Sequence, residues 1–117
     1  PENEMHVSVT SGKEARTASA VLINGEARII SIDGFKIDLV PQGHVVVVNH
    51  TDQPGMIGKV GTLLGDSNIN IAGMQVGRDK PRGRAVMALM VDEDVPAGVL
   101  DRFRKIDGIQ SVKLITF

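Results

Sequence analysis

The chain has 117 residues, 42% of them hydrophobic and 23% charged, which suits one domain, or one small domain with part of another, and is too short for a two-domain dehydrogenase. Thirteen basic against fourteen acidic side chains give a net charge of −1, and this balance argues against a general nucleic-acid binder. With 3% aromatic residues and no cysteine, stacking platforms are hard to build, and disulfides, iron–sulfur clusters and thiol catalysis are excluded.

The first forty residues have the pattern of short strands and tight turns. Asn24-Gly25 and Asp33-Gly34 tolerate the positive φ angles of two-residue hairpin turns. The sequence therefore predicts an antiparallel β-meander with strands at residues 5–10, 16–23, 27–32 and 35–40. This segment has few apolar residues to bury, so residues 1–42 are interpreted as part of a larger β-domain.

Residues 43–117 have sharper signals, beginning with a valine-rich strand over residues 44–49. Pro54 is expected to begin a helix that Thr51 or Asp52 caps. The helix would present one apolar face, formed by Met56, Ile57, Val60, Leu63 and Leu64.

The rest of this part repeats the same pattern. Two strands, residues 69–76 and 85–91, flank a polar hairpin loop; a second helix follows Pro96, and residues 109–117 alternate as a last strand. This order predicts an α+β, ferredoxin-like βαββαβ domain. Its central strands are apolar on both faces, so we expect the face away from the helices to meet another copy or the N-terminal meander.

The turn after the first strand of this domain is the strongest candidate site. Backbone N–H groups of Gly55 and Met56 at a helix start would attract a carboxylate, and Asp52 beside them would attract an ammonium group. Together they describe a receptor for an amino-acid zwitterion. A plain capping turn explains the same residue types. The Asn70 amide is a further candidate ligand, although an Asn at a strand start is also a common turn former.

Two groups of cations are weaker candidates for binding anions. Arg78, Lys80, Arg82 and Arg84 crowd one loop, which a solvated hairpin tip also explains. Arg28 and Lys36, with Lys13, would form an anion patch in the first part. No phosphate-loop motif, metal-ligand spacing or catalytic constellation occurs, so neither catalysis nor a metal site is expected.

Three motifs resemble the ACT domain, an amino-acid-binding regulatory module, over residues 44–117. Residues 50–60 match its opening turn, in which Asp or Asn precedes a basic residue and Pro-Gly; Gln53 stands where Arg is more common. Residues 68–71 match the Asn-Ile entry to its second strand. The final strand is matched by Gly108, Ile109 and Val112.

Residues 24–35, 57–65 and 70–78 together resemble the C-terminal regulatory part of the long-form D-3-phosphoglycerate dehydrogenase family, including the end of its intervening domain. Iron–sulfur L-serine dehydratases carry similar modules and are the alternative. The resemblance implies side-by-side ACT dimers that bind L-serine at their interface. It assigns effector contacts to His50, Asp52 and Asn70, with backbone at Gly55, Met56 and Ile57, and an anion position to Arg28.

The sequence therefore predicts a non-catalytic regulatory and dimerisation module that binds L-serine or a similar small amino acid. Its parent would use NAD, and this chain would hold no cofactor. A dimerisation module without a ligand and a small stand-alone enzyme remain alternatives. The short aliphatic runs and the polar N-terminus, which lacks Met, favour a cytoplasmic protein cut from a longer one.

Overall fold

The computed structural model describes residues 4–11 and 14–117, with side chains from residue 17 onward. The chain divides into two compact units, Pro1–Pro41 and Gln42–Phe117, and each is described by itself. None of the helices in the described part is long and apolar enough to cross a bilayer.

The first unit is the predicted β-meander. Its antiparallel strands pair in chain order, as β1 (Glu4–Ser11), β2 (Glu14–Ile23), β3 (Glu26–Ile32) and β4 (Phe35–Leu39). Both predicted hairpin turns are confirmed, because Asn24 and Asp33, like the glycines that follow them, have positive φ angles. Lys13 lies outside the described residues, so the structure is silent on that member of the predicted anion patch.

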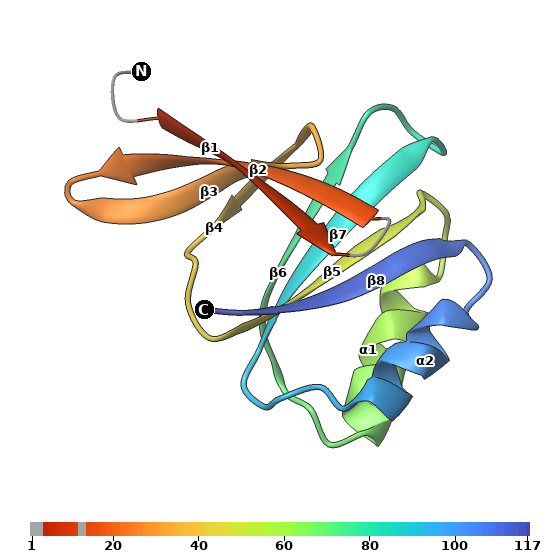
Figure 1. Cartoon of the computed structure of the whole chain (residues 1–117). Helices are drawn as coiled ribbons and strands as arrows, with labels where there is room; N and C mark the ends of the chain where they lie inside the picture. The colour runs from red at the N-terminus through yellow and green to blue at the C-terminus, as the bar shows by residue number, and fades with distance from the viewer. Residues whose placement is uncertain (1–3, 12–13) are drawn as a thin grey trace. The chain divides into compact units, whose positions relative to one another are not determined.

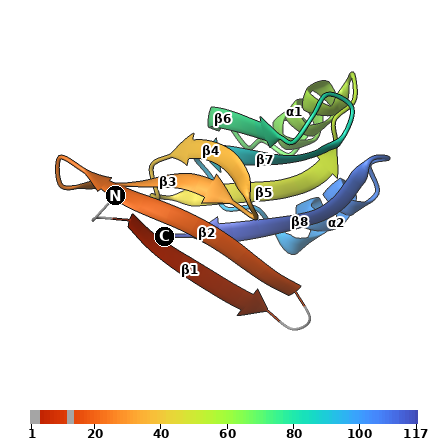
Figure 2. The same cartoon turned by 90° about the horizontal axis from the view of Figure 1, so that it is seen from above.

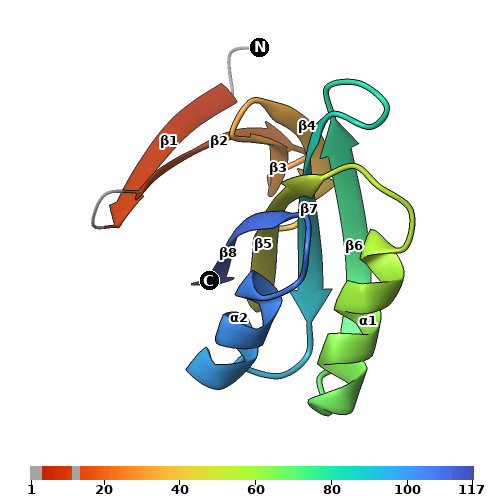
Figure 3. The same cartoon turned by 90° about the vertical axis from the view of Figure 1, so that its right-hand side faces the viewer.

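The second unit is the predicted ferredoxin-like fold, with a four-stranded antiparallel sheet in the order β6-β7-β5-β8. Figure 2 shows β6 and β8 at the two edges of this sheet. Both helices cover the same face, and α1 lies on the β6 side (Figures 1 and 3). The elements are β5 (His44–Thr51), α1 (Met56–Asp66), β6 (Ile71–Arg78), β7 (Arg84–Val91), α2 (Ala97–Arg104) and β8 (Ile109–Thr116).

The core of this unit lies between the sheet and the two helices. Val46 and Val48 of β5 point toward the helices and pack with Leu64 of α1 and Phe103 of α2, and Phe103 is fully buried. Val45 and Val47 alternate to the other face of the sheet. That another copy or the meander meets this face stays a prediction.

The predicted cap of the first helix is wrong. The helix begins at Met56, and its N-cap is Gly55, whose φ of 86° is left-handed and which makes no side-chain cap bond. Pro54 lies in the turn before it. Asp52 cannot act as the cap because its carboxylate is bound by the β6–β7 hairpin instead.

The prediction of the apolar helix face is also wrong for one residue. Met56, Val60 and Leu64 are buried, as predicted, and Leu63 packs against the core. Ile57, in contrast, is 53% exposed. At 100° per residue it falls on the flank of the helix away from α2, so its apolar side chain is left beside the β6 edge.

The loop before β8 requires a glycine at position 108. Gly108 has a φ of 94°, and a Cβ there would lie 2.6 Å from the Gln53 Nε2 atom and 2.9 Å from the Met56 Cε atom. We expect Gly108→Ala to destabilise the chain by about 1–3 kcal/mol, measured by urea unfolding. The control is Gly98→Ala in α2, where a Cβ meets no atom within 4 Å. Equal urea midpoints for the two variants would contradict this account.

Candidate functional site

Asp52 lies directly after β5, at the end of the sheet where α1 begins. Its Oδ2 atom accepts a hydrogen bond from the Arg82 backbone N–H at 3.0 Å and one from the Arg78 guanidinium at 3.0 Å. Its own N–H donates to the Gly83 carbonyl at 2.8 Å. Since no donor in the described part of the chain reaches Oδ1, this oxygen is free to accept a hydrogen bond from a ligand ammonium group.

These donors also set the charge state of the carboxylate. The backbone N–H of Arg82, followed by the Arg78 guanidinium, holds the pKa of Asp52 below its usual range. Asp52 is therefore ionised at neutral pH.

A pH dependence of stability follows from this shift. A carboxyl whose pKa is lower in the folded state stabilises the fold above its unfolded pKa, and this contribution is lost as the pH falls through the folded pKa. We expect stability measured by urea unfolding to fall below about pH 4. The Asp52→Asn variant lacks this contribution of the carboxylate. Its free energy of unfolding should therefore fall less between pH 5 and 3 than that of the native chain. Parallel profiles would contradict the assignment.

His50, two residues before Asp52, is a buried polar residue with a free ring nitrogen. Its side chain is 2% exposed, its Nδ1 donates to the Thr51 carbonyl at 2.9 Å, and its Nε2 is buried without a partner in the described structure. In β5 it lies on the same face as Val46 and Val48, so it points toward the helices. The unpaired nitrogen is the kind of group that a polar ligand would satisfy.

The start of α1 lies at the same end of the sheet (Figure 3). Among the described residues, the N–H groups of Gly55 and Ile57 have no backbone acceptor, whereas the Met56 N–H makes one long bond of 3.4 Å to Gln53. Met56 contributes only backbone because its side chain is buried. These N–H groups and the helix dipole favour a bound anion.

Asn70 lies at the opposite end of the same sheet. It precedes β6, whose first residue pairs with Val91, while Asp52 follows the end of β5 that pairs with Arg84. The eight residues of β5 span roughly 25 Å between the two ends. One chain alone therefore does not bring Asn70 to Asp52 and His50.

Comparison with known proteins agrees with the fold. The ACT domain model matches residues 44–108, more than half of the chain. The chain belongs to the ACT domain family. Similar curated proteins include D-3-phosphoglycerate dehydrogenases of Archaeoglobus fulgidus (48% identical over 102 residues), Synechocystis (46% over 101) and Bacillus subtilis (43% over 116).

These matches cover most of this chain, 86%, 86% and 97% in the same order, but only 19%, 18% and 22% of the relatives. The chain thus spans about a fifth of the length of the dehydrogenases it matches. The resemblance to the regulatory part of this enzyme family is confirmed. The activity of the whole enzymes belongs to the proposals below.

In this ACT domain Gln53 faces away from the β6 edge. Its Nε2 atom donates to the Asp107 carbonyl at 3.2 Å, in the loop before β8. The replacement of the common Arg by Gln at this position thus alters the contact between two loops at the β8 side.

A groove of this domain lies elsewhere, between α1 and α2. It measures about 560 Å³ and shares only Gly55 with the predicted site. Its lining residues are Gly55, Gly58, Lys59, Thr62, Leu63, Asp66, Arg102 and Ile106. This groove therefore does not bring the predicted effector residues together.

The predicted anion patch of the first unit is occupied by an acid. Arg28 forms an ion pair with Asp38 at 2.6 Å, and Asp38 shares its face of β4 with Lys36. The Arg28 Nε atom is buried without a partner in the described structure. The two cations therefore have a carboxylate between them, which lowers their attraction for a free anion.

The partners of the two candidate side chains were not foreseen from the sequence. Arg78 was interpreted as part of a solvated loop, yet it binds Asp52. Asp92 and Glu93 accept hydrogen bonds from the Asn70 side-chain amide and backbone N–H, both at 2.8 Å. These pairs join residues 22 to 26 positions apart, and only the strand register brings them together.

Proposed function

We propose that this ACT domain is a regulatory module that binds a small amino acid, L-serine by family, between two copies of the chain. The observation that carries the proposal is the separation of the site into two halves. His50, Asp52 and the start of α1 lie at one end of the sheet, and Asn70 lies at the other. The first half faces both charges of a zwitterion, and Asn70 would add a further contact from the other copy.

The β6 edge is suited to receive a second copy. Within the described sheets β6 bonds only to β7, so its other edge has unpaired N–H and C=O groups. Ile57 and Val76 are 53% and 41% exposed beside this edge. On the same flank of α1, Gly61 and Gly65 have open space around their Cα atoms, which permits a second helix to approach closely.

A two-fold axis through this edge would unite the two halves of the site. Antiparallel pairing of β6 with its copy places the start of one strand beside the end of the other. Asn70 of one copy then lies beside Asp52 and His50 of the other copy, and the dimer has two equivalent sites. The ligand carboxylate would face the N–H groups at Gly55 and Ile57. Its ammonium and hydroxyl groups would face Asp52, Asn70 and the acceptor nitrogen Nε2 of His50.

The dehydrogenase relatives suggest the biological role. In such an enzyme NAD and substrate would bind to other domains, and L-serine would act from a distance by favouring one arrangement of the ACT interface. Regulation of an L-serine dehydratase would use the same site. A module that only dimerises would keep the apolar β6 edge without binding a ligand.

Calorimetric titration of the 117-residue chain with L-serine, glycine and L-alanine tests the proposal. We expect saturable heat with L-serine, which Asn70→Ala removes. Asp79→Ala, a change to an exposed carboxylate of the β6–β7 hairpin, is the matched control and should bind normally. A stable dimer without heat for any amino acid would instead favour the dimerisation module.

A further inference from the structure

Two loops of the ACT domain have opposite charge and lie at opposite ends of the sheet. The hairpin loop between β6 and β7 has four cations, Arg78, Lys80, Arg82 and Arg84, against the acids Asp52 and Asp79. The loop after β7 has three consecutive carboxylates, Asp92, Glu93 and Asp94. We call the first the basic hairpin and the second the acidic loop.

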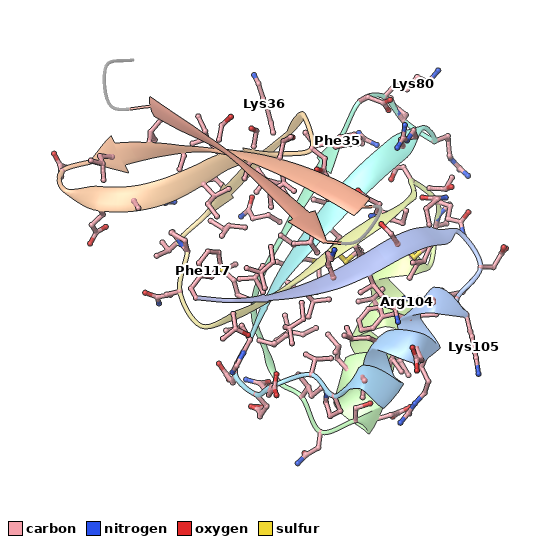
Figure 4. All side chains as sticks on the ribbon, viewed as in Figure 1. Phe35, Lys36, Lys80, Arg104, Lys105 and Phe117 are labelled. Carbon is pink, nitrogen blue, oxygen red and sulfur yellow. The ribbon has the colours of Figure 1, made fainter. Side chains whose placement is uncertain are left out.

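Most of these charges have no opposite charge nearby among the residues that the structure describes. Among the described residues, Arg78 pairs with Asp52, but no carboxylate lies within 4 Å of the side chains of Lys80, Arg82 or Arg84. Figure 4 shows Lys80 extending outward at the hairpin tip. No Lys or Arg of the described part lies within 4 Å of Asp92 or Glu93, whose hydrogen bonds go to Asn70.

The two-fold pairing that unites the halves of the effector site also brings these loops together. The basic hairpin lies at the end of β6, and the acidic loop lies beside its start, because Ile71 pairs with Val91. Across a β6–β6 junction the two β7 strands are three interstrand spacings apart, about 14 Å. Lysine and arginine side chains extend across much of this distance, and the Debye length is about 8 Å at physiological ionic strength.

We propose that the basic hairpin of one copy and the acidic loop of a second copy attract each other at both ends of the interface. This inference rests on the proposed side-by-side dimer. The attraction selects the antiparallel arrangement, because a parallel junction would oppose hairpin to hairpin and loop to loop. It also makes dimerisation depend on salt.

A pair of charge-reversed chains tests the inference. The hairpin variant is Lys80→Glu with Arg84→Glu, and the loop variant is Glu93→Lys with Asp94→Lys, which keeps Asp92 as the acceptor for the Asn70 amide. In a homodimer of either variant, like charges face each other. In a mixed dimer, the acidic hairpin of the first faces the basic loop of the second, and the native hairpin of the second faces the native acidic loop of the first.

We expect each variant alone to dimerise about 10-fold more weakly than the native chain, and the mixture to form mixed dimers preferentially, measured by sedimentation equilibrium and native mass spectrometry. The native dimer should weaken about 3-fold or more between 0.1 M and 1 M salt. Lys105→Glu, at the exposed end of α2 (Figure 4), should dimerise close to normally. Glu93→Gln, which keeps an acceptor for the Asn70 backbone N–H but lacks the charge, should fall between the native chain and the loop variant.

The outcomes distinguish a failure of the charge pairing from a failure of the proposed side-by-side dimer. If the native chain dimerises while the mixture shows no preference for mixed dimers and no salt dependence, the charge pairing is wrong and the dimer stands. If the native chain is monomeric at every concentration and salt, the side-by-side dimer itself is wrong.

Discussion

An equimolar mixture of Asp52→Ala and Asn70→Ala chains, refolded together, should regain L-serine binding that neither variant has alone. Each effector site is expected to take Asp52 from one copy and Asn70 from the other. A homodimer of either variant therefore lacks one contact at both sites, and we expect its affinity to fall about 10- to 100-fold. A mixed dimer has one site with both residues intact.

The size of this recovery is fixed by the symmetry of the dimer. Random pairing makes about half of the dimers mixed, each with one restored site, so about a quarter of the native sites should return. Calorimetric stoichiometry measures this fraction. If the mixture still fails to bind L-serine although mixed dimers form, the site is not shared between chains.

Phe103→Ala should have the largest effect on stability among single changes in this domain. Phe103 is fully buried where α2 packs against the sheet, and its truncation leaves a cavity as well as removing apolar contact. We expect a loss of about 3–5 kcal/mol in the free energy of unfolding, measured in urea.

The matched control for this change is Phe117→Ala. Phe117 is 53% exposed after the end of β8, so the same truncation should cost less than about 1 kcal/mol. Similar losses for the two variants would show that α2 does not pack on the core as described.

The order of strands and helices could be predicted from the sequence because each signal was local. Asn24-Gly25 and Asp33-Gly34 mark their turns by backbone chemistry alone. The helix start was misjudged for the same reason. Asp52 has the right type and spacing for a cap, but the hairpin from residues 78–84 offers it an ionic and a backbone partner that no local pattern reveals.

The sequence predicts which residues could contact the ligand, but it does not predict how these residues are arranged in space. Residue type indicated that Asp52 and Asn70 could hold an amino acid, and the family resemblance added His50. Whether one chain brings the three side chains together depends on the sheet register. The register places Asn70 about one strand length away. Ile57, which the helical period predicted to be buried, is exposed instead, and this exposure is one of the observations on which the proposed dimer rests.

Sedimentation equilibrium of the 117-residue chain with and without saturating L-serine tests the two-chain site most directly. A ligand that contacts both copies must stabilise the dimer by its differential affinity for the paired state. We predict that L-serine strengthens dimerisation by about 10-fold or more, and that Asn70→Ala removes this effect. An unchanged dimer dissociation constant at saturating L-serine would contradict the account.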